Sequence, residues 1–181
     1  PELPGVIVHR VEVELSRQQR KLYDELEREA LTYLGNYPLA LSIPMELDLR
    51  LRQMSLGVPS FNEDGTVDYK PDCKSSKLDA MMDIIADLPE DEPVVVWVHS
   101  QRFIKAILHR LKKAGIKALE ISGKAHGDFQ AMINGHIRVL VILHEAGAEG
   151  IDGLQRVCHT EIWLSQSNSL IINEQATGRL N

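Results

Sequence analysis

An arginine near the end of the chain has the clearest chemical potential. Arg179 follows Gly178 in the segment Gln175-Ala-Thr-Gly-Arg179, in the last turn of an expected helix. A guanidinium stays charged at any working pH and offers several donors in a rigid fork that matches phosphate oxygens. In phosphoryl transfer, such a group stabilises the charge on the transferring phosphoryl. Arg179 is therefore a candidate for contact with phosphate.

Three further groups of polar and small residues each follow a predicted strand. They are His99-Ser100-Gln101-Arg102, Ser122-Gly123-Lys124, and the segment from His144 to Asp152. Functional residues of an open parallel sheet lie beyond the carboxyl ends of its strands, so we expect these groups to share one edge. The small residues Ala146, Gly147 and Gly150 would let backbone N–H groups approach phosphates closely, although a tight crossover turn has the same composition.

The elements that must position these residues alternate regularly from Ser75 onward. Apolar runs predict strands at 93–98, 117–121, 138–143 and 160–164. Helical patterns separate them, beginning with a helix that Ser76 caps and that carries Leu78, Met81 and Ile85 on one face. Strands separated by such helices imply right-handed crossovers. We predict an α/β fold with a doubly wound parallel sheet over residues 76–181.

The first 75 residues have a different pattern. Val6 to Leu15 alternates as a strand would, and Ser16-x-x-Gln19 is a capping box that opens a helix. A second helix is expected from Met45 to Leu56, followed by a hairpin around Asp64-Gly65. The acidic run there lacks the ligand spacing of a calcium loop. Residues 1–75 are thus predicted to form a strand, a helical appendage and a hairpin.

Composition excludes several classes of protein. The chain is 44% hydrophobic and 25% charged, which is typical of a globular domain, and its two cysteines cannot build a disulfide framework or a four-cysteine zinc site. Neither a long apolar run nor a signal-peptide layout is present, so we expect no membrane association and a cytoplasmic location, or a nuclear one in a eukaryote. The histidines lack ligand spacing, and we predict no metal site.

Charge is distributed unevenly. The net charge of −6 argues against bulk electrostatic coating of nucleic acid, yet seven basic residues lie between Arg102 and Lys124. A solvated helix face explains such a cluster, and so does a nucleic-acid contact. Ser122-Gly123-Lys124 is not a complete phosphate loop, because the pattern G-x-x-x-x-G-K-[ST] is missing.

The order of these motifs resembles that of the superfamily 2 helicases, in particular the Swi/Snf-type DNA-dependent ATPases. Gln175, Ala176, Gly178 and Arg179 match motif VI, and the chain ends before the second arginine of that motif, as a truncated one would. Gly150-Ile151-Asp152 resembles motif V. Ser75-Ser-Lys-Leu78 matches the opening of the second lobe, and Val94 to Ser100 matches motif IV in type.

The resemblance implies the second, C-terminal RecA-like lobe of an ATP-hydrolysing helicase or translocase. It implies ATP and Mg²⁺ as cofactors of the intact protein, and duplex DNA and the first RecA-like lobe as partners. Alone, this lobe is expected to be inactive, because the phosphate loop belongs to the other lobe. The implied catalytic residue is Arg179, and the implied nucleotide-binding residues are Gly150, Asp152, Gln175 and Arg179. The implied DNA contacts are Ser100, Gln101, Arg102, Lys124, Ala146 and Gly147.

One alternative remains open at this point. A non-enzymatic α/β module that binds a protein or a nucleic acid would share the same strands and helices. In that case Arg179 would be an ordinary surface charge, and the basic helix would meet a protein partner.

Overall fold

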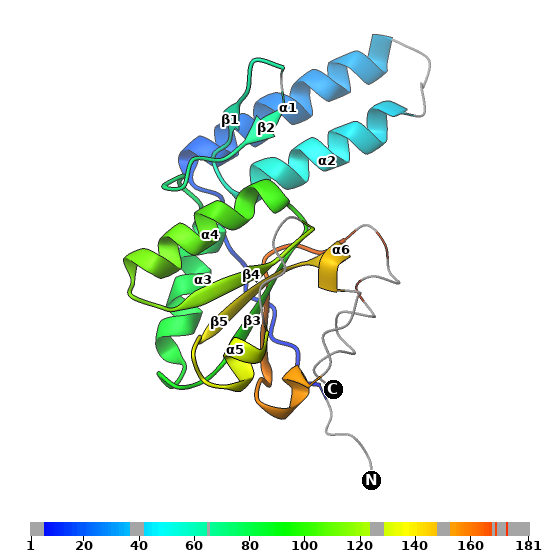
Figure 1. The fold of residues 1–181 in the computed structure, drawn as a ribbon. Coiled ribbons are helices and arrows are strands. Elements are labelled where there is room, and N and C mark those ends of the chain that lie inside the picture. The colour runs from blue at the N-terminus through cyan, green and yellow to red at the C-terminus, as the bar shows by residue number, and fades with distance from the viewer. Residues whose placement is uncertain are drawn as a thin grey trace.

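The computed structural model describes residues 6–36, 42–64, 66–123, 129–147, 153–167, 169 and 173. Figure 1 shows two long helices projecting beyond a sheet that is flanked by shorter helices. In chain order the elements are α1 (Arg17–Asn36), α2 (Ser42–Leu56), β1 (Ser60–Phe61), β2 (Val67–Asp68), α3 (Ser76–Asp87), β3 (Val94–Val98), α4 (Gln101–Lys113), β4 (Ala118–Ile121), α5 (Gln130–Ile133), β5 (Val139–Leu143), α6 (His144–Gly147), the 3₁₀ helix η1 (Leu154–Arg156) and β6 (Thr160–Trp163).

The main sheet is parallel, with strand order β4-β5-β3-β6. Every residue of β3 and β5 is buried, which explains why both strands are continuous apolar runs rather than alternating ones. Successive strands that are not neighbours in the sheet require crossovers over its faces. The predicted α/β fold is confirmed and is RecA-like in its sheet and flanking helices.

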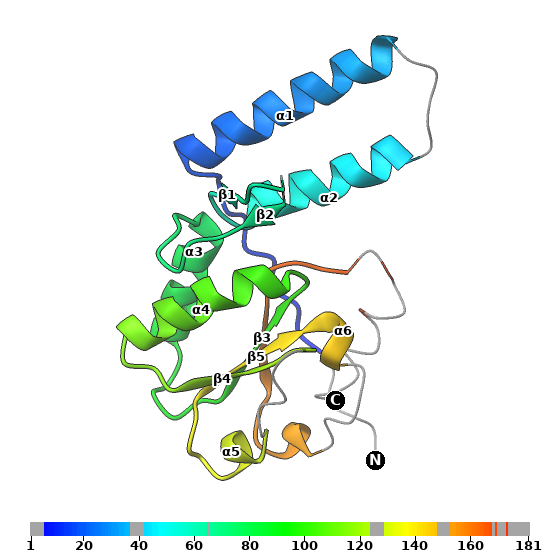
Figure 2. The same cartoon turned by 45° about the horizontal axis from the view of Figure 1, so that its top comes forward.

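Two apolar cores lie on the two faces of this sheet. Helices α3 and α4 cover one face with Leu78, Ile85 and Phe103 among their fully buried side chains. On the opposite face, Met132 of α5 and Leu154 of η1 pack against odd-numbered residues of β3. Figure 2 shows α5 well separated from α4, in keeping with their opposite faces.

The start of α3 differs from the predicted start by one residue. Ser75, and not Ser76, is the N-cap, and its hydroxyl accepts a hydrogen bond from the N–H of Leu78 at 3.1 Å. The same hydroxyl donates to the carbonyl of Leu56 at the end of α2. Ser75 is buried, with 1% of its surface exposed, and its hydroxyl bonds both Leu56 and Leu78. The additional bond to the Leu56 carbonyl explains why Ser75 rather than Ser76 caps the helix.

The N-terminal helices meet the sheet domain through a buried glutamine. Ser16 accepts from the N–H of Gln19 at 3.3 Å, as the capping box predicts. The Gln19 side chain donates from Nε2 to the carbonyl of Met54 in α2, and its Oε1 accepts from the N–H of Ser76 in α3. Gln19 is fully buried, and its one amide joins the start of α1, the end of α2 and the start of α3.

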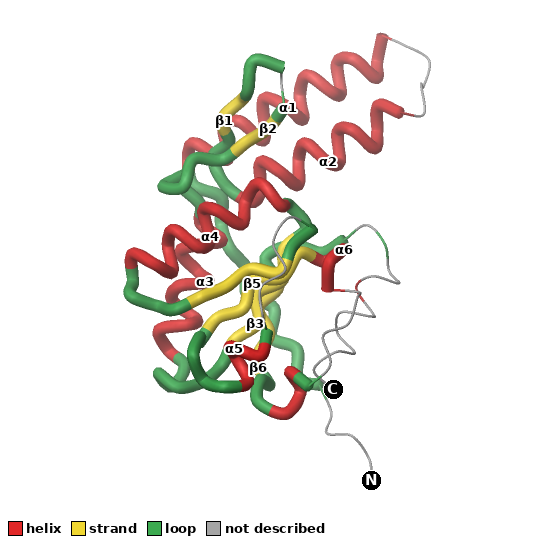
Figure 3. The backbone as a smooth tube through the Cα atoms, in the orientation of Figure 1, coloured by secondary structure: helices red, strands yellow, loops and turns green. Residues whose placement is uncertain are grey.

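The predicted hairpin is present, and the predicted N-terminal strand is wrong. β1 and β2 pair antiparallel, with Phe61 opposite Val67. Residues 6–16 form no strand, as Figure 3 shows, and Val6, Ile7 and Val8 are exposed. Alternation predicts which side chains would share a face, but a strand also needs a hydrogen-bonded neighbour, and the described residues provide none.

The region before Ser75 shares its packing with the sheet domain. Met54 and Leu56 from α2 and Tyr69 after β2 are buried in the same cluster as β3 and α4. The Tyr69 ring contacts the edge of Phe103 with ring centroids 4.8 Å apart. Residue 75 therefore marks a change of architecture within one continuous core.

Candidate functional site

The carboxyl ends of the four parallel strands bring the predicted polar groups to one edge of the sheet. Residues 99–101 follow β3, Ser122 and Gly123 follow β4, α6 follows β5, and residues 164–166 follow β6. β4 and β6 are the outer strands, so their turns flank those of β5 and β3. This is the place where open α/β sheets bind ligands.

Two of the predicted nucleic-acid contacts lie at the start of α4. Ser100 is the N-cap residue and makes no side-chain capping bond. Gln101 Nε2 lies 3.5 Å from the hydroxyl of Ser122, which in turn donates to Glu120 Oε1 at 3.0 Å. The turns after β3 and β4 are thus linked by side chains, as a shared ligand surface requires.

Arg102 points toward the hairpin. Its Nη1 donates to the carbonyl of Val67 in β2 at 2.8 Å. Further along the same helix, Lys105 Nζ lies 2.7 Å from a carboxylate oxygen of Asp68, and the pKa of Asp68 is lowered chiefly by this bond. Arg110 pairs with Asp79 of α3, also at 2.7 Å. Three of the five lysines and arginines on α4 therefore contact neighbouring elements of the chain itself.

The segment after β5 begins with α6. Ala146 is half-buried and packs against the apolar clusters of both sheet faces, and Gly147 is the last residue of this helix. Lys124, Gly150, Asp152, Gln175 and Arg179, the other predicted site residues, lie outside the described residues.

A buried cluster of rings at this edge was not predicted from the sequence. The His144 ring stacks on Trp97, with centroids 5.5 Å apart, and lies 4.9 Å from the ring of Trp163. Both indole N–H groups donate to the same oxygen of Glu161, each at 2.8 Å. Burial raises the pKa of Glu161, and the two indole bonds oppose that rise.

Burial lowers the pKa of two histidines in this region. His144 is 1% exposed and must donate from Nε2, because its partner 2.7 Å away is the carbonyl of Ser165. Burial lowers its pKa. Burial, with a smaller effect of Arg52, lowers the pKa of His99 to about 4. Among the described residues, both ring nitrogens of His99 and Nδ1 of His144 are buried without a hydrogen-bond partner.

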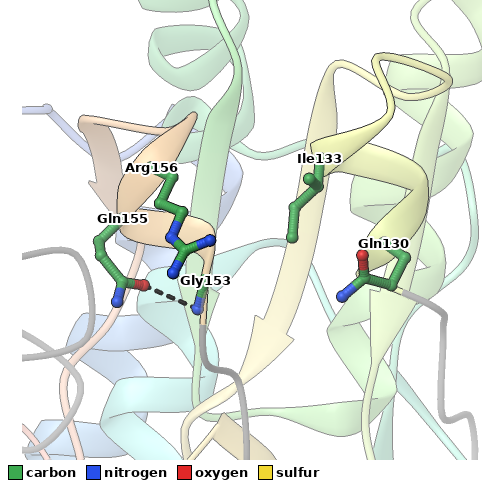
Figure 4. A pocket seen from close by; sticks show the side chains of 5 residues that line it. All are labelled: Gln130, Ile133, Gly153, Gln155 and Arg156. Carbon is green, nitrogen blue, oxygen red and sulfur yellow. Dashed lines mark hydrogen bonds between the residues drawn. The ribbon is translucent and has the colours of Figure 1, made fainter.

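A separate hollow lies between α5 and η1. Gln130, Ile133, Gly153, Gln155 and Arg156 line a volume of about 370 Å³, drawn in Figure 4. Gly153 adopts φ 106°, a conformation that favours glycine, and its N–H donates to Gln155 Oε1 at 2.8 Å. Two amides and a guanidinium could meet a polar ligand here, but none of these five residues belongs to a predicted motif.

The described residues include no cluster of side chains that could bind a metal ion. No group of three histidine, cysteine, aspartate or glutamate side chains in the described ranges could hold an ion together. Cys73 and Cys158 are both buried, and burial raises the pKa of each thiol to about 11, so neither is a ready ligand or nucleophile. Within the same ranges, none of the helices combines the length and apolar character needed to cross a bilayer.

Comparison with known proteins yields matches only among solved structures. No protein-family model matches the chain, and no curated protein sequence does. The C-terminal part of the Fun30 ATPase domain is 19% identical, with a TM-score of 0.74 over 99% of this chain and 81% of that one. The C-terminal domain of the Sulfolobus solfataricus SWI2/SNF2 ATPase is 16% identical, with a TM-score of 0.66 over 86% of this chain and 70% of that one.

A third solved structure shares the fold. A chain from the crystal structure of fission yeast Ccq1 and Tpz1 is 12% identical, with a TM-score of 0.60 over 94% of this chain and 64% of that one. A fold can host unrelated activities, so this likeness concerns architecture. The likeness to Fun30 extends through the N-terminal helices as well as the sheet, and the chain has the RecA-like fold of the C-terminal lobe of a Swi2/Snf2-type ATPase.

Proposed function

We propose that this chain is the C-terminal lobe of a Swi/Snf-type, DNA-dependent ATPase and works with a first RecA-like lobe. The observation that carries the proposal is a coincidence of two independent features. The fold matches such lobes over nearly the whole chain, and the sequence carries Gln175-Ala-Thr-Gly-Arg179 after the last strand of the sheet, in the order of motif VI.

In this proposal, Arg179 is an arginine finger. ATP and Mg²⁺ would be held mainly by the phosphate loop and acidic residues of the first lobe, where the metal neutralises charge on the phosphates. Lobe closure would bring the Arg179 guanidinium to the γ-phosphate. Gln175, Gly150 and Asp152 would line the nucleotide side of the same interface. The chain by itself would not turn over ATP.

The proposed DNA track is the surface formed by the turns after β3, β4 and β5. Ser100 and Gln101 at the start of α4, with Lys124 and the Ala146-Gly147 end of α6, would meet the phosphate backbone of duplex DNA. Arg102 already donates one N–H to Val67, and a guanidinium has further donors for a phosphate. With a net charge of −6, binding would depend on these few contacts.

A non-enzymatic module is the second candidate function. One observation favours it: Arg102, Lys105 and Arg110 already contact the chain's own elements, which leaves fewer cationic groups for a phosphate backbone. In that case the sheet edge would bind a protein partner, and Arg179 would have no role in phosphoryl transfer.

Kinetics of the two-lobed protein test the first candidate. Arg179→Lys keeps the charge and loses the fork, so kcat for ATP hydrolysis should fall by roughly 10²-fold or more with a much smaller change in nucleotide affinity. Lys21→Met on the exposed face of α1 is the matched control. A normal kcat for Arg179→Lys would show that Arg179 is not the arginine finger, and an absence of ATP hydrolysis by the natural two-lobed protein would favour the non-enzymatic module.

DNA binding tests the track separately. Arg102→Ala and Lys124→Ala should each lower the slope of log Kobs against log salt by about one unit, with little sequence dependence. Fluorescence anisotropy at several salt concentrations measures this slope. An unchanged slope for Arg102→Ala would assign that side chain to its contact with Val67 alone.

A further inference from the structure

Three consecutive backbone carbonyls after β6 are each bonded by a basic side chain from a different part of the chain. The donors are Lys77 Nζ to Leu164 O at 3.0 Å, His144 Nε2 to Ser165 O at 2.7 Å, and Arg52 Nη1 to Gln166 O at 3.3 Å. We name these three donors and residues 164–166 the carbonyl clasp. Figures 1 and 2 show the chain after β6 passing between α2 and the carboxyl edge of the sheet.

The donors of the carbonyl clasp are themselves held in place. Arg52 Nε lies 2.9 Å from a carboxylate oxygen of Asp48, one turn earlier in α2. Lys77 lies 3.4 Å from the hydroxyl of Ser55, and burial lowers its pKa. The Ser165 hydroxyl accepts from the N–H of His99 at 3.0 Å. An ionised donor bonds a carbonyl more strongly than a neutral one, so the Lys77 and Arg52 bonds hold this segment more strongly than neutral side chains would.

The chain remains tied beyond the carbonyl clasp. Asn173 accepts from the N–H of Ser167 at 2.8 Å and donates to the carbonyl of Ser167 at 2.9 Å. One side-chain amide thus bonds both backbone polar groups of Ser167. The backbone is therefore anchored at 164–167 and again at Asn173, six positions before Arg179.

We propose that Arg52 and Lys77, which hold the backbone at residues 164–166, are positioning residues for Arg179, the arginine finger of the proposed function. The positioning role rests on the proposed function, in which Arg179 is the arginine finger. A catalytic group misplaced by about 1 Å can lose about 10²-fold in rate, so anchors outside the nucleotide site can govern kcat. The N-terminal helices would then take part in catalysis without touching ATP.

The carbonyl clasp itself is tested on this chain by hydrogen exchange. Arg52→Met and Lys77→Met keep most of the apolar stem and remove the donor. Backbone amides of residues 164–173 should exchange roughly tenfold faster in each variant, while those of β4 and β5 keep their rates. Lys21→Met should change neither region. Unchanged exchange at 164–173 would overturn the inference, whatever the kinetics show.

The catalytic consequence is tested in the two-lobed protein. Each variant should lower kcat roughly tenfold with KM for ATP within about twofold, and Arg52→Lys should recover part of the loss because it restores a donor. Normal kcat in Arg52→Met and Lys77→Met, beside a large loss in Arg179→Lys, would overturn the positioning role and leave the proposed function standing. Normal kcat in Arg179→Lys would instead overturn the arginine-finger role in the proposed function.

Discussion

The charged face of α4 and the carboxyl edge of the sheet differ in how their polar groups are satisfied. On α4, Arg102, Lys105 and Arg110 are paired with the hairpin and with α3. At the sheet edge, His99 and His144 keep buried ring nitrogens without partners among the described residues. The charged side chains of α4 therefore connect neighbouring elements of the fold. At the sheet edge, the unsatisfied groups are ring nitrogens of buried histidines, and this is the edge where open α/β sheets bind ligands.

The largest expected change in the free energy of unfolding comes from removing the buried indole of Trp97 at the sheet edge. Trp97 is 1% exposed, stacks on His144, and bonds Glu161. Trp97→Ala should lower the free energy of unfolding by about 3–5 kcal/mol, because it opens a cavity and leaves the histidine without its packing surface. Urea unfolding followed by circular dichroism measures this. Trp163→Ala, at a half-buried position, is the comparison and should be milder. Equal, small losses would mean that the edge cluster is not part of the core.

A pH dependence of intermediate size should come from His99. Its folded pKa of about 4 lies below the unfolded value near 6.5, so the unfolded chain binds the proton first and stability falls as pH drops through this window. The loss from this residue between pH 7 and pH 5 should be about 2 kcal/mol. His144 adds a loss of the same sign.

Unfolding free energies at pH 7 and pH 5 check this for the natural chain and for His99→Gln. The variant should lose less stability on acidification, because the glutamine does not titrate. The same pH dependence in both chains would show that the His99 ring is not held neutral by the fold.

The smallest expected effect belongs to α4. The Lys105 and Asp68 side chains are 45% and 27% exposed, and exposed ion pairs typically contribute about 0.2–1 kcal/mol. A double-mutant cycle with Lys105→Ala and Asp68→Ala should give a coupling in that range, and the coupling should shrink in high salt. Lys112→Ala supplies an exposed control from the last turn of the same helix. A coupling above about 2 kcal/mol would erase the contrast with the sheet edge.

The sheet could be predicted from sequence because its signal is local. Val94 to Val98 and Val139 to Leu143 are apolar throughout, and only a strand buried on both faces needs such a run. The carboxyl-edge rule then placed Ser100, Gln101 and Ala146 at one edge. The strand at Val6 to Leu15 failed for the opposite reason, since pairing depends on a neighbour that alternation does not specify.

The histidine and tryptophan cluster required information that is not local. Trp97 and Trp163 are register partners on β3 and β6, 66 positions apart, and only the strand order brings them together. The carbonyl clasp was equally inaccessible, because its acceptors are backbone carbonyls and every residue has one. Positively charged residues such as Arg52 and Lys77 give no sequence signal that distinguishes a carbonyl partner from solvent.

The buried Gln19 amide lies at the point where a small rotation would move the two long helices the most at their far ends. Its bonds to Met54 and Ser76 lie near the base of the α1 and α2 pair, which projects away from the sheet in Figures 1 and 2. A helix of 20 residues is about 30 Å long, so a rotation of about 5° at the base would displace its far end by about 2.6 Å. A small rotation around Gln19 would thus move the far ends of α1 and α2 by a distance comparable to that of a side-chain rotamer change.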